Sequence, residues 1–168
     1  RVGNAQRVLD FGCGVGILTT FYARQLPDRE FVGLDRSAAS IAAAQQKARA
    51  LGLANVCFDC VDAETEQLSG RYDLIVATHA LVQAEQDPGI PSESWRTFMR
   101  ARDAGPQTSF EQRTGLGARL NELIAVLGPN GRMILCEKTR QLARRVPIQR
   151  ALAERGLQLI ESPELIRY

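Results

Sequence analysis

The sequence is poor in the features that mark membrane, secreted and nucleic-acid-binding proteins. No apolar run approaches the roughly 18 residues of a membrane-spanning helix, and no secretory signal opens the chain. The net charge of +2 is too small to indicate a nucleic acid or an acidic membrane as partner. With only 6% aromatic residues, no basic face interleaved with aromatic side chains is visible. The composition therefore favours neither a membrane nor a nucleic acid as partner.

Cysteine is scarce, and its pattern argues against metal or redox chemistry. Two of the four cysteines, Cys57 and Cys60, form a C-x-x-C inside a predicted strand. Positions three apart in a strand are separated by roughly 10 Å and face opposite ways, whereas a disulfide needs Cα atoms within about 7 Å. No second cysteine or histidine pair is present to complete a zinc site. We therefore expect no metal centre, and free thiols in a reducing, cytoplasmic compartment.

What the sequence does have is the size and composition of one globular domain. Its 168 residues are 45% hydrophobic and 24% charged, which is enough to bury a core. We predict a single domain over residues 1–168. Because the first predicted strand begins at Arg7, close to the start of the chain, we expect the domain to be a fragment of a longer protein.

The chain is organised around the stretch Val8–Gly16, which reads VLDFGCGVG. An apolar run ends in three glycines spaced two apart, and an amphipathic segment, Ile17–Leu26, follows at once. This pattern predicts a buried strand that turns tightly into a helix, because glycine allows positive φ and lets a ligand approach the backbone. The N-terminus of that helix offers free N–H groups and a partial positive charge to the ligand.

Apolar strands alternate with helices along the rest of the chain. The predicted strands are Arg7–Phe11, Phe31–Asp35, Asn55–Val61, Tyr72–Thr78, Gly131–Glu137 and Leu157–Glu161. Further helices are predicted between Ser37 and Gly52, over residues 116–127 and over Ile148–Arg155. This alternation favours an α/β fold with a doubly wound, mostly parallel sheet covered by helices on both faces. Such folds bind ligands at the carboxyl ends of the strands, where the glycine turn, Asp35 and Asp62 lie.

Residues 81–110 interrupt the alternation. They contain three prolines and two glycines, and they predict one helix, Ser92–Arg102. Because the segment directly follows the fourth strand, we interpret it as an insertion over the ligand edge of the sheet. Trp95 and Phe98 on its helix are expected to pack down as a lid.

The glycine turn departs from the dinucleotide-binding pattern. A G-x-G-x-x-G motif that begins at Gly12 requires a third glycine where Ile17 stands. The chain instead reads D-x-G-x-G-x-G, with Asp10 two residues before the first glycine. A carboxylate at this place repels a pyrophosphate and suits a ligand that carries an ammonium group. The pattern therefore disfavours a nicotinamide-dependent reductase.

Five motifs in order, VLDFGCGVG, FVGLD, CVDAE, YDLIVATHAL and LGPNGRMIL, resemble the motif series of class I S-adenosylmethionine-dependent methyltransferases, in its small-molecule form. The resemblance covers residues 7–137. It implies a Rossmann-like fold with strand order 3-2-1-4-5-6 and S-adenosylmethionine as the cofactor. The cofactor-binding residues that it implies are Asp10, Gly12, Cys13, Gly14, Gly16, Asp35, Arg36, Asp62, Ala63 and Thr78.

Within this set, the resemblance implies distinct roles for the three acids. Asp10 is implied to lie near the methionyl amino group, Asp35 to accept both ribose hydroxyls, and Asp62, with Ala63, to meet the adenine. Two of the acids have an alternative, since Asp35 can cap the following helix and Asp62 can be a turn acid. Cys13 can simply be a small residue that the turn tolerates.

The methyl acceptor is less legible, because displacement at a sulfonium mainly needs positioning. His79, the only histidine, is the candidate catalytic residue, either as a general base or as a side chain that lines the pocket. The fourth-strand motif ATHAL differs from the [D/N]-P-P-[Y/F] of enzymes that methylate DNA bases or glutamine amides. We therefore expect transfer to an oxygen, nitrogen or carbon of a small molecule, or of a protein side chain. The alternative is a non-catalytic cofactor-binding or interaction domain.

The C-terminal part departs from the family pattern as well. The family closes its sheet with a seventh, antiparallel strand, and residues 161–168 leave little room for one. An exposed edge of this kind invites pairing. We expect a dimer or a neighbouring domain at this edge of the sheet.

Overall fold

The computed structural model describes residues 3–82, 107–137 and 145–164. In these residues the strands are β1 (Arg7–Phe11), β2 (Glu30–Asp35), β3 (Val56–Cys60), β4 (Tyr72–Thr78) and β5 (Leu127–Cys136). The helices are α1 (Ile17–Gln25), α2 (Ala38–Ala50), α3 (Gln107–Thr114), α4 (Leu116–Val126) and α5 (Arg145–Glu154). β4 has the predicted bounds, and α1, α2, α4, β1, β2 and β3 lie within a residue or two of theirs.

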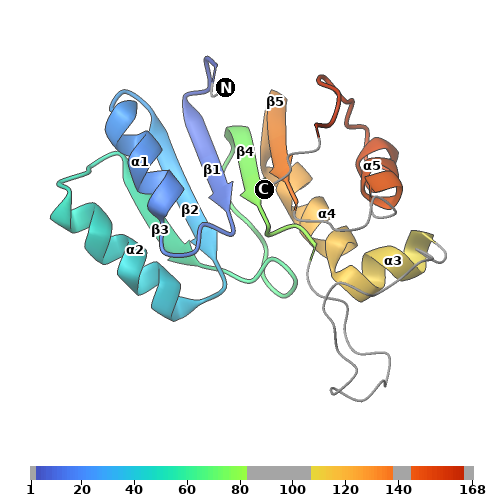
Figure 1. The fold of residues 1–168 in the computed structure, drawn as a ribbon, viewed down its shortest axis with the longest axis horizontal. Helices are drawn as coiled ribbons and strands as arrows, with labels where there is room; N and C mark the ends of the chain where they lie inside the picture. Colours follow the sequence, from blue (N-terminus) through green and yellow to red (C-terminus); the bar gives the residue numbers. More distant parts are fainter. Residues whose placement is uncertain (1–2, 83–106, 138–144, 165–168) are drawn as a thin grey trace.

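The strands form one parallel sheet in the order β3-β2-β1-β4-β5 (Figure 1). Successive residues of β1 face opposite layers: Val8 shares a hydrophobic cluster with Ala23 of α1, whereas Leu9 shares one with Leu120 of α4. α1 and α2 therefore cover one face, and α4, with α5 beside it, covers the other. The predicted doubly wound α/β fold is confirmed, with the predicted order of the first five strands.

The largest hydrophobic cluster lies between the sheet and α4. Leu9, Ile75, Leu120 and Leu123 are fully buried there, and burying each such side chain contributes about 1.5–3 kcal/mol. A parallel sheet covered on both faces needs strands that are apolar on both sides. The carboxyl ends of the parallel strands β1, β2 and β4 meet at one edge of the sheet.

The prediction of a sixth strand is wrong. Residues 157–164 follow α5 as irregular chain, and Leu159 and Ile160 are 66% and 71% exposed. A strand needs a neighbour for its backbone N–H and C=O groups, and in the described part of the chain β5 pairs with β4 alone. Leu157–Glu161 does not pair with the outer edge of β5, so its backbone joins no ladder in the described residues. The dimer or neighbouring domain at this edge stays a prediction.

β5 starts at Leu127, earlier than the predicted Gly131. Leu127 pairs with Tyr72, and the register shifts between Tyr72 and Leu74. Such an irregularity makes room for Pro129, which cannot donate to a ladder and is tolerated at edges and bulges. The Gly128–Pro129 pair thus ends α4 as predicted and also stands inside the edge strand.

The predicted helix Ser92–Arg102, with Trp95 and Phe98, lies outside the described residues. The last residues of the predicted insertion fall within α3, whose Phe110 is buried in the core. α5 begins at Arg145 rather than at the predicted Ile148. None of the described helices is long and apolar enough to cross a membrane.

Candidate functional site

The glycine turn joins the end of β1 to the end of β2. The N–H groups of Gly12 and Cys13 both donate to the carbonyl of Leu34, at 2.7 and 3.0 Å, and Gly16 N–H donates to the carbonyl of Cys13 at 3.0 Å. Gly12, Gly14 and Gly16 all have positive φ, between 53° and 76°. The turn is therefore a rigid left-handed corner that L side chains rarely adopt.

The three glycines of the turn are required for different reasons. A Cβ on Gly12 would lie 2.2 Å from the Cβ of Ala80, and one on Gly16 would lie 2.8 Å from the ring of Phe58. A Cβ on Gly14 would meet no atom of the described residues within 4 Å. Gly12 and Gly16 thus let protein segments pack closely, whereas Gly14 faces open space where a ligand can approach the backbone.

Asp10, at the end of β1, is the most deeply buried of the predicted site acids, and its residue is 9% exposed. Its Oδ2 accepts a hydrogen bond from Thr19 Oγ1 at 2.6 Å. Burial raises the pKa of Asp10, the Thr19 hydroxyl lowers it, and the nearby charge of Asp35 raises it further. An ionised carboxylate in this position is stabilised by a cationic ligand.

Thr19 is a site residue that the sequence pattern did not reveal. It is 1% exposed, while its helix neighbours Ile17 and Leu18 are 63% and 47% exposed. α1 thus turns a polar residue inward and apolar ones outward, the reverse of an ordinary surface helix. The signal in the sequence was the Thr19–Thr20 pair in an otherwise apolar first turn.

Asp35, at the end of β2, connects the turn to the next helix. Its Oδ2 accepts from Gly14 N–H at 2.9 Å, and its Oδ1 accepts from Ser37 N–H at 2.8 Å. Ser37 is itself the N-cap of α2, since its Oγ accepts from Ser40 N–H at 3.3 Å. Ser37, and not Asp35, is therefore the residue that caps α2. Asp35 supports this cap by accepting the N–H of Ser37. Each carboxylate oxygen still has lone pairs for hydroxyl donors.

Asp62 and Ala63 follow β3 on the far side of Asp35. Asp62 Oδ1 accepts from Glu64 N–H at 3.0 Å, and the Asp62 N–H donates to Glu66 Oε1 at 3.1 Å. Asp62 thus makes the local contacts of a turn acid, and its role toward the adenine stays a prediction. Ala63 is 5% exposed and belongs to the large hydrophobic cluster.

Thr78 and His79 lie where β4 ends, beside the glycine turn. His79 has φ 56°, in the left-handed region, and its N–H donates to the carbonyl of Cys136 at 2.7 Å. Its side chain is exposed, while Thr78 is half-buried. Backbone conformations of this kind cost about 1–3 kcal/mol and collect at functional sites. The strain marks the carboxyl end of β4 as a constrained part of the site.

Cys13 and Arg36 complete the predicted set. Burial, with the charges of Asp10 and Asp35, raises the pKa of Cys13 to about 12, so its thiol stays neutral. Arg36 is exposed, and its carbonyl accepts from Cys60 Sγ at 3.5 Å. Among the described residues no group of three or more His, Cys, Asp or Glu side chains is arranged to hold a metal ion.

The sequence pattern also did not reveal two charged residues that bind the backbone of Leu81, after β4. Glu137, directly after β5, accepts a hydrogen bond from Leu81 N–H at 2.7 Å and also faces the N–H groups of Ala80 and Val82. Arg119 of α4 is 3% exposed; it donates to the carbonyls of Leu81 and Thr114, at 2.7 and 3.0 Å, and forms an ion pair with Glu64. For Arg119, the signal in the sequence was an arginine at a position of an apolar helix that faces the core.

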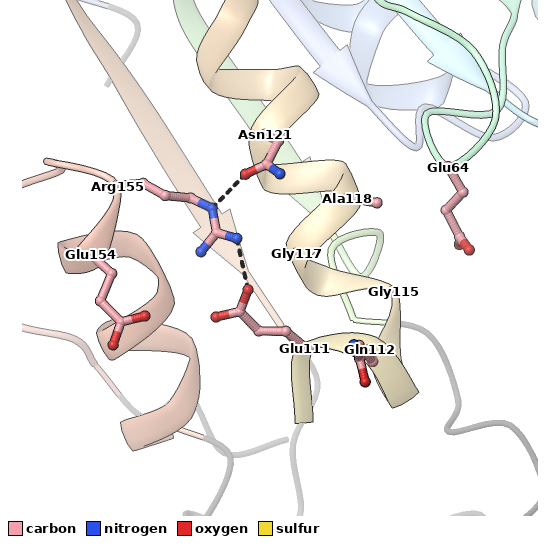
Figure 2. A pocket seen from close by; sticks show the side chains of 9 residues that line it. All are labelled: Glu64, Glu111, Gln112, Gly115, Gly117, Ala118, Asn121, Glu154 and Arg155. Atoms are coloured by element: carbon pink, nitrogen blue, oxygen red, sulfur yellow. Dashed lines mark hydrogen bonds and ion pairs between the residues drawn. The ribbon is translucent and has the colours of Figure 1, made fainter. Parts of the chain in front are cut away.

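A hollow of about 630 Å³ lies apart from the glycine turn, between α3, α4 and α5 (Figure 2). In it, Arg155, which directly follows α5, reaches Glu111 at 2.7 Å and Asn121 at 2.8 Å. These bonds tie α5 to α3 and α4. The lining includes none of the residues that the sequence assigns to the cofactor.

Comparisons with known proteins agree with this geometry. A family profile described as "Methyltransferase domain" matches residues 3–162. The trans-aconitate 2-methyltransferase of Deinococcus radiodurans is 35% identical over 89 residues, which cover 53% of this chain and 32% of that protein. The malonyl-[acyl-carrier protein] O-methyltransferase of Acetivibrio thermocellus is 33% identical over 70 residues, which cover 42% of this chain and 24% of that protein. The matches thus span a third or less of these two relatives.

Among solved structures, StiE O-MT superposes with a TM-score of 0.68 at 18% identity, over 96% of this chain and 48% of that chain. This likeness concerns the fold, and it confirms the Rossmann-like methyltransferase architecture. The family match extends over nearly the whole chain and confirms both the predicted family and S-adenosylmethionine as its cofactor. The chain belongs to the class I S-adenosylmethionine-dependent methyltransferases.

Proposed function

We propose that this domain transfers the methyl group of S-adenosylmethionine to an oxygen of a small organic acid. The observation that carries the proposal is the arrangement around Gly14, where an open glycine face adjoins two carboxylates, Asp10 and Asp35, on neighbouring strands. When bound, the cofactor supplies a methyl group on a sulfonium, whose leaving group is a neutral thioether. The chain then has to hold the acceptor in line with that methyl group.

The residues present fit the polar parts of this cofactor. The desolvated Asp10 carboxylate lacks a cation among the groups that shift its pKa, and an ammonium group would stabilise its ionised form. Asp35 keeps acceptor capacity beyond its bonds to Gly14 and Ser37, which suits two ribose hydroxyls. In the described residues, the position of a Cβ on Gly14 is free of other atoms within 4 Å. We propose that Gly12, Cys13, Gly16, Arg36, Asp62, Ala63 and Thr78 complete the cofactor site.

The acceptor class rests on the names of the two curated relatives. One acts on trans-aconitate and the other on a malonyl group, and both of these acceptors carry carboxylates. A carboxylate is already ionised at neutral pH, so no proton has to be removed before attack. We therefore propose that exposed His79 lines the acceptor side of the site, and that it does not act as a general base.

A second candidate is a cofactor-binding domain without catalytic activity in a larger protein. The observation that favours it is length, because the matches span 32% and 24% of the two relatives. The acceptor pocket of this protein can therefore depend on chain outside these 168 residues. In that case the domain binds the cofactor and transfers nothing by itself.

Calorimetric titration with S-adenosylhomocysteine tests the cofactor half of the proposal. Asp35→Asn removes a charged acceptor and should weaken binding by about tenfold or more. The matched control is Asp59→Asn, on the exposed surface of β3, which should bind like the wild type. If the wild-type chain shows no binding, the proposal is wrong.

Transfer of a labelled methyl group to a panel of acceptors tests the other half. We expect incorporation into small carboxylic acids and none into amines of similar size. His79→Gln should retain turnover of the acid acceptors, and a loss of turnover at unchanged cofactor affinity would restore the general-base hypothesis. Cofactor binding with no transfer to any acceptor would favour the second candidate.

A further inference from the structure

The segment that follows β4, residues 80–82, belongs to no helix or strand. These residues are partly or fully buried, so their backbone N–H groups need acceptors. The side chain of Glu137, which comes directly after β5, lies against them. Glu137 Oε1 accepts from Leu81 N–H at 2.7 Å, and its carboxylate also faces the N–H groups of Ala80 and Val82. One carboxylate thus faces three successive amides.

The same segment is held from its other side by Arg119. This buried arginine of α4 donates to the carbonyl of Leu81 at 2.7 Å, and the Leu81 side chain is fully buried. Leu81 therefore has both its N–H and its C=O bonded to charged groups, which form stronger hydrogen bonds than neutral ones. Arg119 is independently paired with Glu64, so loss of Glu137 does not leave it without a partner.

The segment held by Glu137 packs directly on the glycine turn. Gly12 lies so close to Ala80 that a Cβ on Gly12 would come within 2.2 Å of the Ala80 Cβ. Just before it, His79 is held in its left-handed conformation by the bond to Cys136, the residue that precedes Glu137. The end of β5 therefore determines where the chain after β4 meets the turn.

We infer that Glu137 is a positioning residue of the cofactor site: by holding residues 80–82 against Gly12 it shapes the side of the site that receives the methionyl part of the cofactor. The inference rests on the proposed function for the location of that part. An ionised carboxylate has four lone-pair positions, enough for the bonded Leu81 N–H and for the neighbouring amides that face it. A glutamine can satisfy some of these donors through its amide oxygen, and an alanine satisfies none.

Calorimetry with two ligands tests the inference. S-adenosylhomocysteine contains the amino-acid part, whereas 5′-methylthioadenosine has the same adenosine without it. Glu137→Ala should weaken S-adenosylhomocysteine binding by about tenfold or more, because hydrogen bonds to charged groups that hold the turn are lost, and should weaken 5′-methylthioadenosine binding less than threefold. Glu137→Gln should recover most of the affinity for S-adenosylhomocysteine. Equal losses for both ligands, or no loss for either, would overturn the inference.

The matched control is Glu122→Ala. Glu122 of α4 is also a carboxylate that accepts a loop amide, with Leu68 N–H at 2.9 Å from its Oε2, but it lies outside the proposed site. This variant should bind both ligands like the wild type. If Glu137→Ala does not fold, Glu137→Gln is measured in its place. This variant should weaken S-adenosylhomocysteine binding a few-fold and weaken 5′-methylthioadenosine binding less.

Amide hydrogen exchange gives a readout that needs no ligand. Glu137→Ala should accelerate exchange both in residues 80–82 and in residues 12–16, whereas Glu122→Ala should accelerate exchange near Leu68 only. Faster exchange confined to residues 80–82 would overturn the inference. A wild-type chain that binds neither ligand contradicts the proposed function, and the exchange experiment then still decides whether Glu137 holds the turn.

Discussion

Replacing Gly12 and Gly14 by alanine, one at a time, should separate packing from ligand access in the glycine turn. Both residues have positive φ, 76° and 53°, and an L side chain in this region costs about 1–2 kcal/mol. At Gly12 the new methyl group also lies 2.2 Å from the Cβ of Ala80, and such overpacking adds about 1–3 kcal/mol. At Gly14 the new methyl group meets no atom of the described residues within 4 Å, so only the backbone cost applies.

The expected loss in the free energy of unfolding is therefore about 2–5 kcal/mol for Gly12→Ala and about 1–2 kcal/mol for Gly14→Ala. Domains of this size are stable by about 5–15 kcal/mol in total, so both variants should fold. Denaturant titration measures the two losses. In contrast, Gly14→Ala should lose about tenfold or more in affinity for S-adenosylhomocysteine, which corresponds to about 1.4 kcal/mol, because its methyl group occupies the open face of the turn.

Gly52→Ala is the matched control. Gly52, which follows the end of α2, has φ 64°, and a methyl group there would also meet none of the described atoms within 4 Å. Its substitution should therefore cost the same backbone energy at a place away from the site. It should leave S-adenosylhomocysteine affinity unchanged. If Gly14→Ala binds the ligand as tightly as Gly52→Ala does, the open face of Gly14 is not where the ligand approaches. Equal stability of Gly12→Ala and Gly14→Ala would refute the packing argument.

Three further predictions concern the charged and sulfur-containing groups. Burial raises the pKa of Asp10 above its ordinary 3.8, so the folded protein holds the carboxyl proton of Asp10 more tightly than the unfolded chain does. Stability is therefore lost as the pH rises from 3.8 through the higher pKa of the folded protein. Asp10→Asn should therefore unfold at higher denaturant concentration than the wild type at pH 7, with the advantage disappearing toward pH 3.8. Arg119→Ala removes the buried donor of the Leu81 and Thr114 carbonyls and should cost about 1–3 kcal/mol for each unsatisfied carbonyl in a urea titration, whereas exposed Arg49→Ala should cost under about 0.5 kcal/mol. The thiol of Cys13, with a pKa raised to about 12, should resist iodoacetamide at pH 8 while exposed Cys60 is alkylated, as peptide mass spectrometry will show; rapid labelling of Cys13 would contradict the described burial.

The fold was largely predictable because its strands are apolar and its helices are periodic over a few turns. Tyr72–Thr78 is the clearest case, since a run that is apolar on both faces can only be satisfied between two helix layers. Leu157–Glu161 shows the limit of that reasoning. Its local pattern is equally compatible with a strand, but whether it forms one depends on a neighbour elsewhere in the chain, and in the described residues β5 has none on that side.

The positions of the acids of the candidate site could be predicted from the sequence. The groups that hold the site together could not. Asp10 and Asp35 stand at strand ends, and a parallel sheet brings such ends together whatever the remaining packing. Thr19, Arg119 and Glu137 act through contacts with residues distant in the sequence. Their residue types alone do not distinguish a buried hydrogen-bond partner from an ordinary surface group.

Local patterns in the sequence are therefore enough to predict the alternation of strands and helices, the glycine turn and the family, because each depends on residues that are neighbours in the chain. The tertiary structure decides what each glycine is for: Gly12 admits Ala80, Gly16 admits Phe58, and Gly14 stays open. It also decides that Glu137 meets residues 80–82. These pairings depend on the register between strands, and register is set by the packing of the whole sheet, which no short stretch of sequence contains.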